Sequence, residues 1–97
     1  MPDQTDQIIE EFLDGKPRAR ELARMIDALE SRRAALVRER ESTRDPARLR
    51  QWDARLREVD RQIAVLREEL AITGFVEDSI RVAVNRPRPL PDEDGAL

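Results

Sequence analysis

The 97-residue sequence contains no cysteine and no histidine. Without cysteine, the chain forms no disulfide and offers no thiolate to a metal ion. Without histidine, it lacks the commonest general base and metal ligand, and Ser-His and Cys-His nucleophilic pairs are excluded. We therefore expect no enzymatic activity, no metal and no cofactor.

Glycines, aromatic residues and long apolar runs are also scarce. The only glycines are Gly15, Gly74 and Gly95, so no glycine-rich loop is present to bind phosphate. No apolar run approaches the roughly 18 residues that a membrane-spanning helix needs. The acidic N-terminus lacks the basic start of a signal peptide. We expect a cytoplasmic protein that does not engage a membrane.

Charged residues make up 40% of the sequence, and with alanine and leucine at helical spacing they are typical of long helices and coiled coils. The net charge of −3 divides into −5 over residues 1–14, +4 over 15–74 and −2 over 75–97. This length allows one small domain. We assign residues 1–85 to a single all-α domain and residues 86–97, which are proline-rich and then acidic, to a disordered tail.

A long helix is predicted from Pro46 to Thr73 because apolar residues recur there at alternating spacings of three and four. Asp45 suits the N-cap, Pro46 the first turn, and Gly74 the position just past the end. The pattern continues for three heptads and is that of a coiled-coil seam. Its members are Leu49, Trp52, Leu56, Val59, Ile63, Leu66 and Leu70.

A second helix is predicted from Pro17 to about Ser42, with Arg33 and Arg40 at seam positions where apolar residues are usual. The short connection ESTRDP predicts that the two helices form a long antiparallel hairpin. A turn centred between Ser42 and Thr43 places Arg33 opposite Trp52, where the guanidinium would stack on the indole. In the alternative interpretation, Trp52 is the exposed edge of a binding surface.

A short element flanks the predicted hairpin at each end. Residues 3–14 read as a helix that Thr5 or Asp6 caps and Gly15 ends. This helix either docks on the hairpin or detaches to grip a partner. Residues 75–85 fit a short C-terminal helix or a strand, and we favour the helix because no other segment offers a strand partner.

The two long helices carry more apolar residues than a hairpin alone can bury. The surplus must meet the terminal segments, a second copy or another protein. We therefore expect a non-enzymatic protein–protein interaction or oligomerisation module, an adaptor-like homodimer that acts through helix packing. The candidate interaction residues are Ile8, Phe12, Arg33, Leu49, Trp52, Leu56, Ile63, Val65 and Ile72.

The run ELARMIDALESRRAALVRER, residues 21–40, is similar to the first helix of the helical chorismate mutases, and FVEDSIRVAV distantly resembles their last helix. The resemblance implies a helical dimer that rearranges chorismate with buried arginines, a lysine farther along the first helix and a late glutamine. Here no lysine follows Lys16, and the last glutamine is Gln62. The alternative function is a small enzyme of this type.

The chain also resembles the small secreted WXG-type proteins in its size and in a tryptophan near the predicted turn. Asp53 and Ala54 follow Trp52, however, where that motif has a variable residue and then glycine. We assign neither family.

A nucleic-acid-binding hairpin is a further alternative, because arginines cluster around the predicted tip. Glu39, Glu41 and Asp45 offset much of their charge, and Trp52 is the one aromatic residue nearby. An acidic chain with one aromatic residue at the site is poorly suited to phosphate-driven binding. The arginines are Arg38, Arg40, Arg44, Arg48 and Arg50.

Overall fold

The computed structural model describes residues 4–86, and every regular element in that range is an α-helix. The helices are α1 (Gln4–Leu13), α2 (Ala19–Glu41) and α3 (Pro46–Asn85). The predicted all-α fold is therefore confirmed for this part of the chain. The predicted tail lies outside the described residues except for Arg86, the C-cap of α3.

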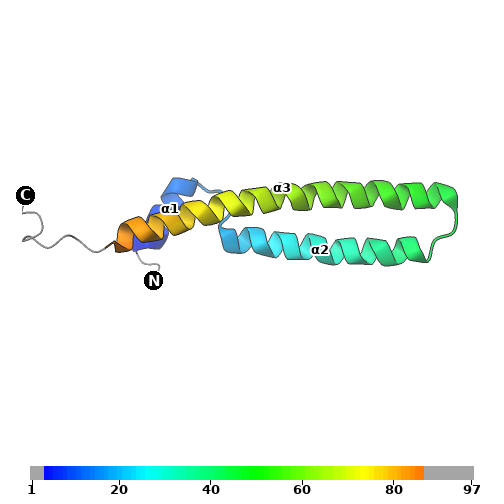
Figure 1. Ribbon diagram of the computed structural model, residues 1–97, viewed down its shortest axis with the longest axis horizontal. Coiled ribbons are helices and arrows are strands. Elements are labelled where there is room, and N and C mark those ends of the chain that lie inside the picture. The colour runs from blue at the N-terminus through cyan, green and yellow to red at the C-terminus, as the bar shows by residue number, and fades with distance from the viewer. Residues whose placement is uncertain (1–3, 87–97) are drawn as a thin grey trace, which may run out of the picture.

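The lengths of α2 and α3 explain the arrangement of the three helices. With 40 residues, α3 is about 60 Å long, whereas α2 has 23 residues and spans about 35 Å. The two helices lie side by side from the loop at residues 42–45 to the start of α2 (Figure 1). Beyond that point α1 takes the place of α2 beside α3, so that α3 has a neighbour along most of its length.

Local capping signals fix two helix boundaries as predicted. The Asp45 carboxylate accepts the backbone N–H of Ala47 at 3.2 Å, and Pro46 opens α3. The chain breaks after α1 because Asp14 (φ 50°) and Gly15 (φ 79°) adopt left-handed backbone angles.

The starts of the first two helices differ from the predictions. Thr5 and Asp6 lie inside α1 and therefore do not occupy its N-cap. The second helix begins at Ala19, two residues later than predicted, with Arg18 at the N-cap.

The predicted end of the third helix at Gly74 is wrong. The helix continues through Gly74 to Asn85, so residues 75–85 are its last turns and no separate C-terminal helix exists in the described range. A glycine inside a helix costs about 1 kcal/mol relative to alanine. Packing of α1 on this half of α3 opposes that cost, and this long-range contact is invisible in the local sequence.

The buried interior is a narrow seam. Ile26, Leu36, Val59 and Ile63 are buried between α2 and α3, and half-buried neighbours complete this layer. Those neighbours are Leu29, Trp52, Leu56, Leu66 and Leu70. Under α1 the buried apolar side chains are Ile9 and Leu13, with Leu22 from the first turn of α2.

Candidate functional site

One flank of the contact between α2 and α3 is bridged by charged side chains. Three ion pairs cross it, with N–O distances of 2.5, 2.5 and 2.6 Å. On α3 the three participating residues are seven apart, so they form one stripe beside the seam. The pairs are Arg40–Asp53, Arg33–Asp60 and Glu30–Arg67, which we call the ion-pair ladder.

The opposite flank is apolar. On α3, Asp60 and Arg67 of the ladder each come directly after a seam residue, whereas Gln62 and Val65 each come directly before one. Because each residue turns the helix by about 100°, positions after and before a seam residue lie on opposite sides of the seam. Gln62 and Val65 line a hollow of about 600 Å³ between α2 and α3. We call this hollow the apolar groove, and it is lined by Met25, Ala28, Leu29, Glu58, Arg61, Gln62, Val65 and Leu66.

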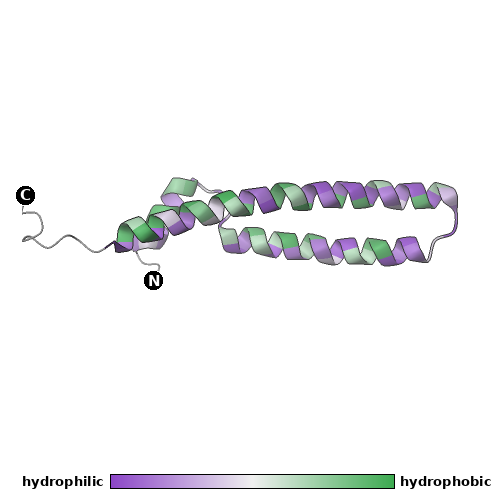
Figure 2. Ribbon diagram, in the orientation of Figure 1, coloured by the Kyte–Doolittle hydropathy of each residue, from purple (hydrophilic) through white to green (hydrophobic). Residues whose placement is uncertain are grey.

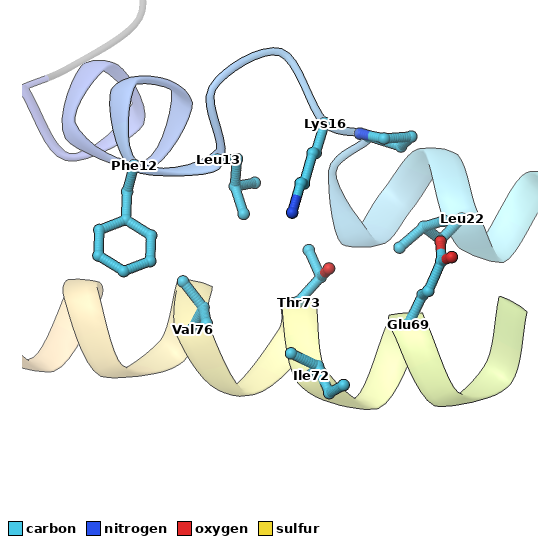
Figure 3. A pocket seen from close by; sticks show the side chains of 9 residues that line it. Phe12, Leu13, Lys16, Leu22, Glu69, Ile72, Thr73 and Val76 are labelled. Atoms are coloured by element: carbon cyan, nitrogen blue, oxygen red, sulfur yellow. The ribbon is translucent and has the colours of Figure 1, made fainter. Parts of the chain in front are cut away.

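A second hollow continues this surface toward α1. It is lined by residues of all three helices and of the α1–α2 connection, with Phe12 above Val76 and with Ile72 and Glu69 on the α3 side (Figure 3). Phe12 is 68% exposed and Ile72 is 60% exposed. Hydrophobic residues are denser in the half of α3 near α1 than in the half near the loop (Figure 2). The apolar surface therefore extends from α2 along α3 to α1.

All three helices meet at the buried carboxylate of Glu77. Its Oε1 accepts hydrogen bonds from Arg18 Nε at 2.7 Å and from the backbone N–H of Ala19 at 3.0 Å. Arg18 also reaches Asp6 of α1 at 3.4 Å, and Arg81 lies 3.7 Å from the other Glu77 oxygen. The side chain of an N-cap residue often accepts a hydrogen bond from a backbone N–H at the start of its helix, but an arginine side chain has no acceptor. At the start of α2, the Glu77 carboxylate accepts such a hydrogen bond instead.

These contacts decide the charge state of Glu77. Burial alone would raise the pKa of its carboxyl group, but the hydrogen bond from Ala19 and the positive charges of Arg18 and Arg81 outweigh it. The pKa of Glu77 is therefore lowered from its ordinary value of 4.5. The hydrogen bond to Glu77 likewise raises the pKa of Arg18. The pair is charged at neutral pH.

The predicted stacking of Arg33 on Trp52 is wrong. The Arg33 guanidinium pairs with Asp60, two turns farther along α3, and it is Arg55 whose Cζ lies 4.9 Å from the indole centroid. The indole N–H of Trp52 donates to the Thr43 hydroxyl at 3.0 Å. Trp52 is half-buried against the seam, and its indole lies at the loop.

The nine candidate interaction residues fall into three groups in the structure. Four belong to the seam or its loop end: Leu49, Trp52, Leu56 and Ile63. Three are exposed on the apolar surface: Phe12, Val65 and Ile72. Arg33 belongs to the ion-pair ladder, and Ile8 is half-buried on α1. The exposed group is the part that is free to contact another molecule.

Neither Arg18 nor Glu77 is among the residues predicted from the sequence. A signal for Glu77 is present, because the three-four spacing of the seam continues past Leu70 through Thr73, Glu77 and Ile80. An acidic side chain at a seam position must find a partner when it is buried. Assigning a helix end at Gly74 concealed that continuity.

The loop end of the molecule carries several arginines, as the nucleic-acid alternative requires. Arg40 is engaged by Asp53 in the ion-pair ladder, whereas Arg38, Arg44 and Arg48 are exposed. Within residues 4–86, no cluster of acidic side chains has the geometry to hold a metal ion. None of the three helices combines the length and the apolar character that crossing a bilayer demands.

No family model matches this chain, and neither the curated proteins nor the solved structures contain a match.

Proposed function

We propose that the protein is a non-enzymatic interaction module, a coiled-coil-like antiparallel helical hairpin that forms a homodimer through its apolar groove. The observation that carries the proposal is the asymmetry of the two flanks between α2 and α3. One flank is polar and bridged by the ion-pair ladder, whereas the other is apolar and leaves Met25 and Val65 45% and 50% exposed. An amphipathic helix pair with one open apolar flank gains by covering it.

Covering the apolar groove would contribute free energy to association. Fully burying a valine or methionine side chain contributes about 1.5–3 kcal/mol, and half of that remains to be gained where the side chain is half exposed. The core of one chain is a single seam, which gives a small domain limited stability. A partner that binds only the folded state adds to that stability.

The exposed side chains of Phe12 and Ile72 continue the same surface and would enlarge the dimer interface. Two chains joined along this face would place four long helices together, an arrangement that bundles commonly adopt. In such an interface, exposed charges determine the relative orientation of the two chains more than the affinity between them.

Sedimentation equilibrium at micromolar concentration tests the proposal. We expect twice the 11.2 kDa mass of one chain, and a lower average mass on dilution. Val65→Glu should shift the equilibrium to the monomer because it buries a charge in the joint. Val82→Glu is the matched control, since Val82 is 69% exposed on α3 but lies outside the groove. A wild-type mass of 11.2 kDa at every concentration would refute the proposal.

A further inference from the structure

The two halves of α3 carry opposite charge. Residues 46–65 contain five arginines and three carboxylates, whereas residues 66–85 contain two arginines and four carboxylates. Two carboxylates of the first half, Asp53 and Asp60, are already engaged by arginines of α2. The free surface of α3 is therefore basic toward the loop and acidic toward α1.

The same polarity appears on the stripe of α3 that borders the apolar surface. Arg61, Val65 and Glu69 are four residues apart and share one face of the helix. Arg61 and Val65 line the apolar groove, and Glu69 lines the neighbouring hollow. This places an exposed valine one turn from a base on one side and one turn from an acid on the other.

Both charged side chains are available to a partner. Arg61 bonds Glu58 at 3.1 Å, but this pair lies within one turn and both side chains are more than half exposed, so it holds Arg61 weakly. Across the described residues, no hydrogen bond or ion pair engages the Glu69 carboxylate.

We infer that a second copy of this chain seats antiparallel on the groove, with Val65 against its counterpart and Arg61 of each copy against Glu69 of the other. This inference rests on the proposed function and adds its geometry. In a two-fold joint each contact occurs twice, so two such ion pairs flank the apolar centre. A parallel alignment would instead bring Arg61 against Arg61 and Glu69 against Glu69.

The antiparallel arrangement also suits α1, which is acidic. Residues 4–14 contain four carboxylates and no base, and α1 lies beside the second half of α3. A copy that runs in the opposite direction brings its basic first half of α3 toward this helix. Charge complementarity therefore extends over the length of the joint.

Charge exchange tests the pairing. Arg61→Glu and Glu69→Arg each create two like-charged contacts in their own homodimers, so each should raise the dissociation constant about tenfold or more. In the heterodimer that forms in an equimolar mixture, the substituted side chain at position 61 of one chain faces the substituted side chain at position 69 of the other. The natural Arg61 and the natural Glu69 face each other in the second contact. The mixture should therefore regain the wild-type dissociation constant, and a mixture that stays as weak as the single variants overturns the inference.

A cross-link at the two-fold axis provides a second measurement. The natural chain has no cysteine, so Val65→Cys introduces one thiol. On oxidation it should give a covalent dimer on a non-reducing gel, and the matched Val82→Cys should not. Circular dichroism checks that each variant keeps its helix content.

The measurements separate the two levels of the proposal. A wild-type dimer without cross-linking at Val65→Cys, and without recovery in the mixture, overturns the antiparallel geometry alone. A wild-type monomer overturns both the dimer and its geometry, and leaves the groove to a different protein.

Discussion

Glu77 on the last turns of α3 accepts a 2.7 Å hydrogen bond from Arg18, the N-cap residue of α2, across 59 residues of sequence. The same carboxylate oxygen accepts the backbone N–H of Ala19. One side chain therefore joins the start of one helix to the side of another, and Asp6 brings α1 into the network through Arg18.

We predict that Glu77→Ala destabilises the fold by about 1–3 kcal/mol, because it leaves the Arg18 guanidinium and the Ala19 N–H without their acceptor. Glu77→Gln keeps an acceptor oxygen and should cost less. Urea denaturation followed by circular dichroism, at a fixed protein concentration, measures both. The matched control is Asp78→Ala, since Asp78 is 77% exposed and should matter little. Equal effects of Glu77→Ala and Asp78→Ala would contradict the structural role of Glu77.

The stability of the protein should also depend on pH through Glu77. The pKa of this carboxyl is lowered in the folded state, so its contribution is fully present above the ordinary value of 4.5 and is lost as pH falls through the folded-state pKa. We expect the wild type to lose stability below about pH 4.5 more steeply than Glu77→Gln. Thermal melts between pH 7 and pH 3 test this, and a constant difference between the two proteins over that range would refute it.

Gly74 and Gly15 should respond oppositely to alanine. Gly74 lies inside α3, and a Cβ added there would meet nothing within 4 Å. Gly74→Ala should therefore stabilise the protein by about 0.5–1 kcal/mol. Gly15 also has open space, but its φ of 79° strains an L side chain, so Gly15→Ala should destabilise. Melting temperatures of the two variants give the signs, and a lower value for Gly74→Ala would show that a bend at this position is needed.

Trp52 should be energetically coupled to Thr43 and not to Arg33. The indole N–H donates to the Thr43 hydroxyl at 3.0 Å, a bond worth about 0.5–1.5 kcal/mol. A double-mutant cycle with Trp52→Phe and Thr43→Val measures this coupling. The corresponding cycle with Arg33→Gln should give no coupling energy, because Arg33 pairs with Asp60. A larger coupling energy of Trp52 to Arg33 than to Thr43 would support the predicted register, which places Arg33 opposite Trp52, against the one in the structure.

The sequence was sufficient where the signal is local. Asp45 followed by Pro46 specifies a helix start through one hydrogen bond and one ring, and both are found in the structure. The left-handed residues at Asp14 and Gly15 end α1 for an equally local reason. The spacing of the seam residues depends only on helical geometry, and the residues predicted for it on α3 are buried or half-buried.

The sequence was insufficient where distant segments decide the outcome. Gly74 has the local character of a helix end, yet α1 packs on the turns that follow it. The pairing of Arg33 depends on how the chain winds through the loop at residues 42–45, which the residue types of a turn do not fix.

The hydrogen bond between the Ala19 N–H of α2 and the Glu77 carboxylate of α3 bears on the order in which the contacts form during synthesis. The backbone N–H of Ala19 obtains its partner from a residue that the ribosome adds 58 positions later. The loop end, where Asp53 reaches Arg40 over 13 positions, can close much earlier. We therefore expect the described helices to assemble from the loop outward, with the Glu77 contact, which joins α3 to Arg18 and through it to α1, as a late step.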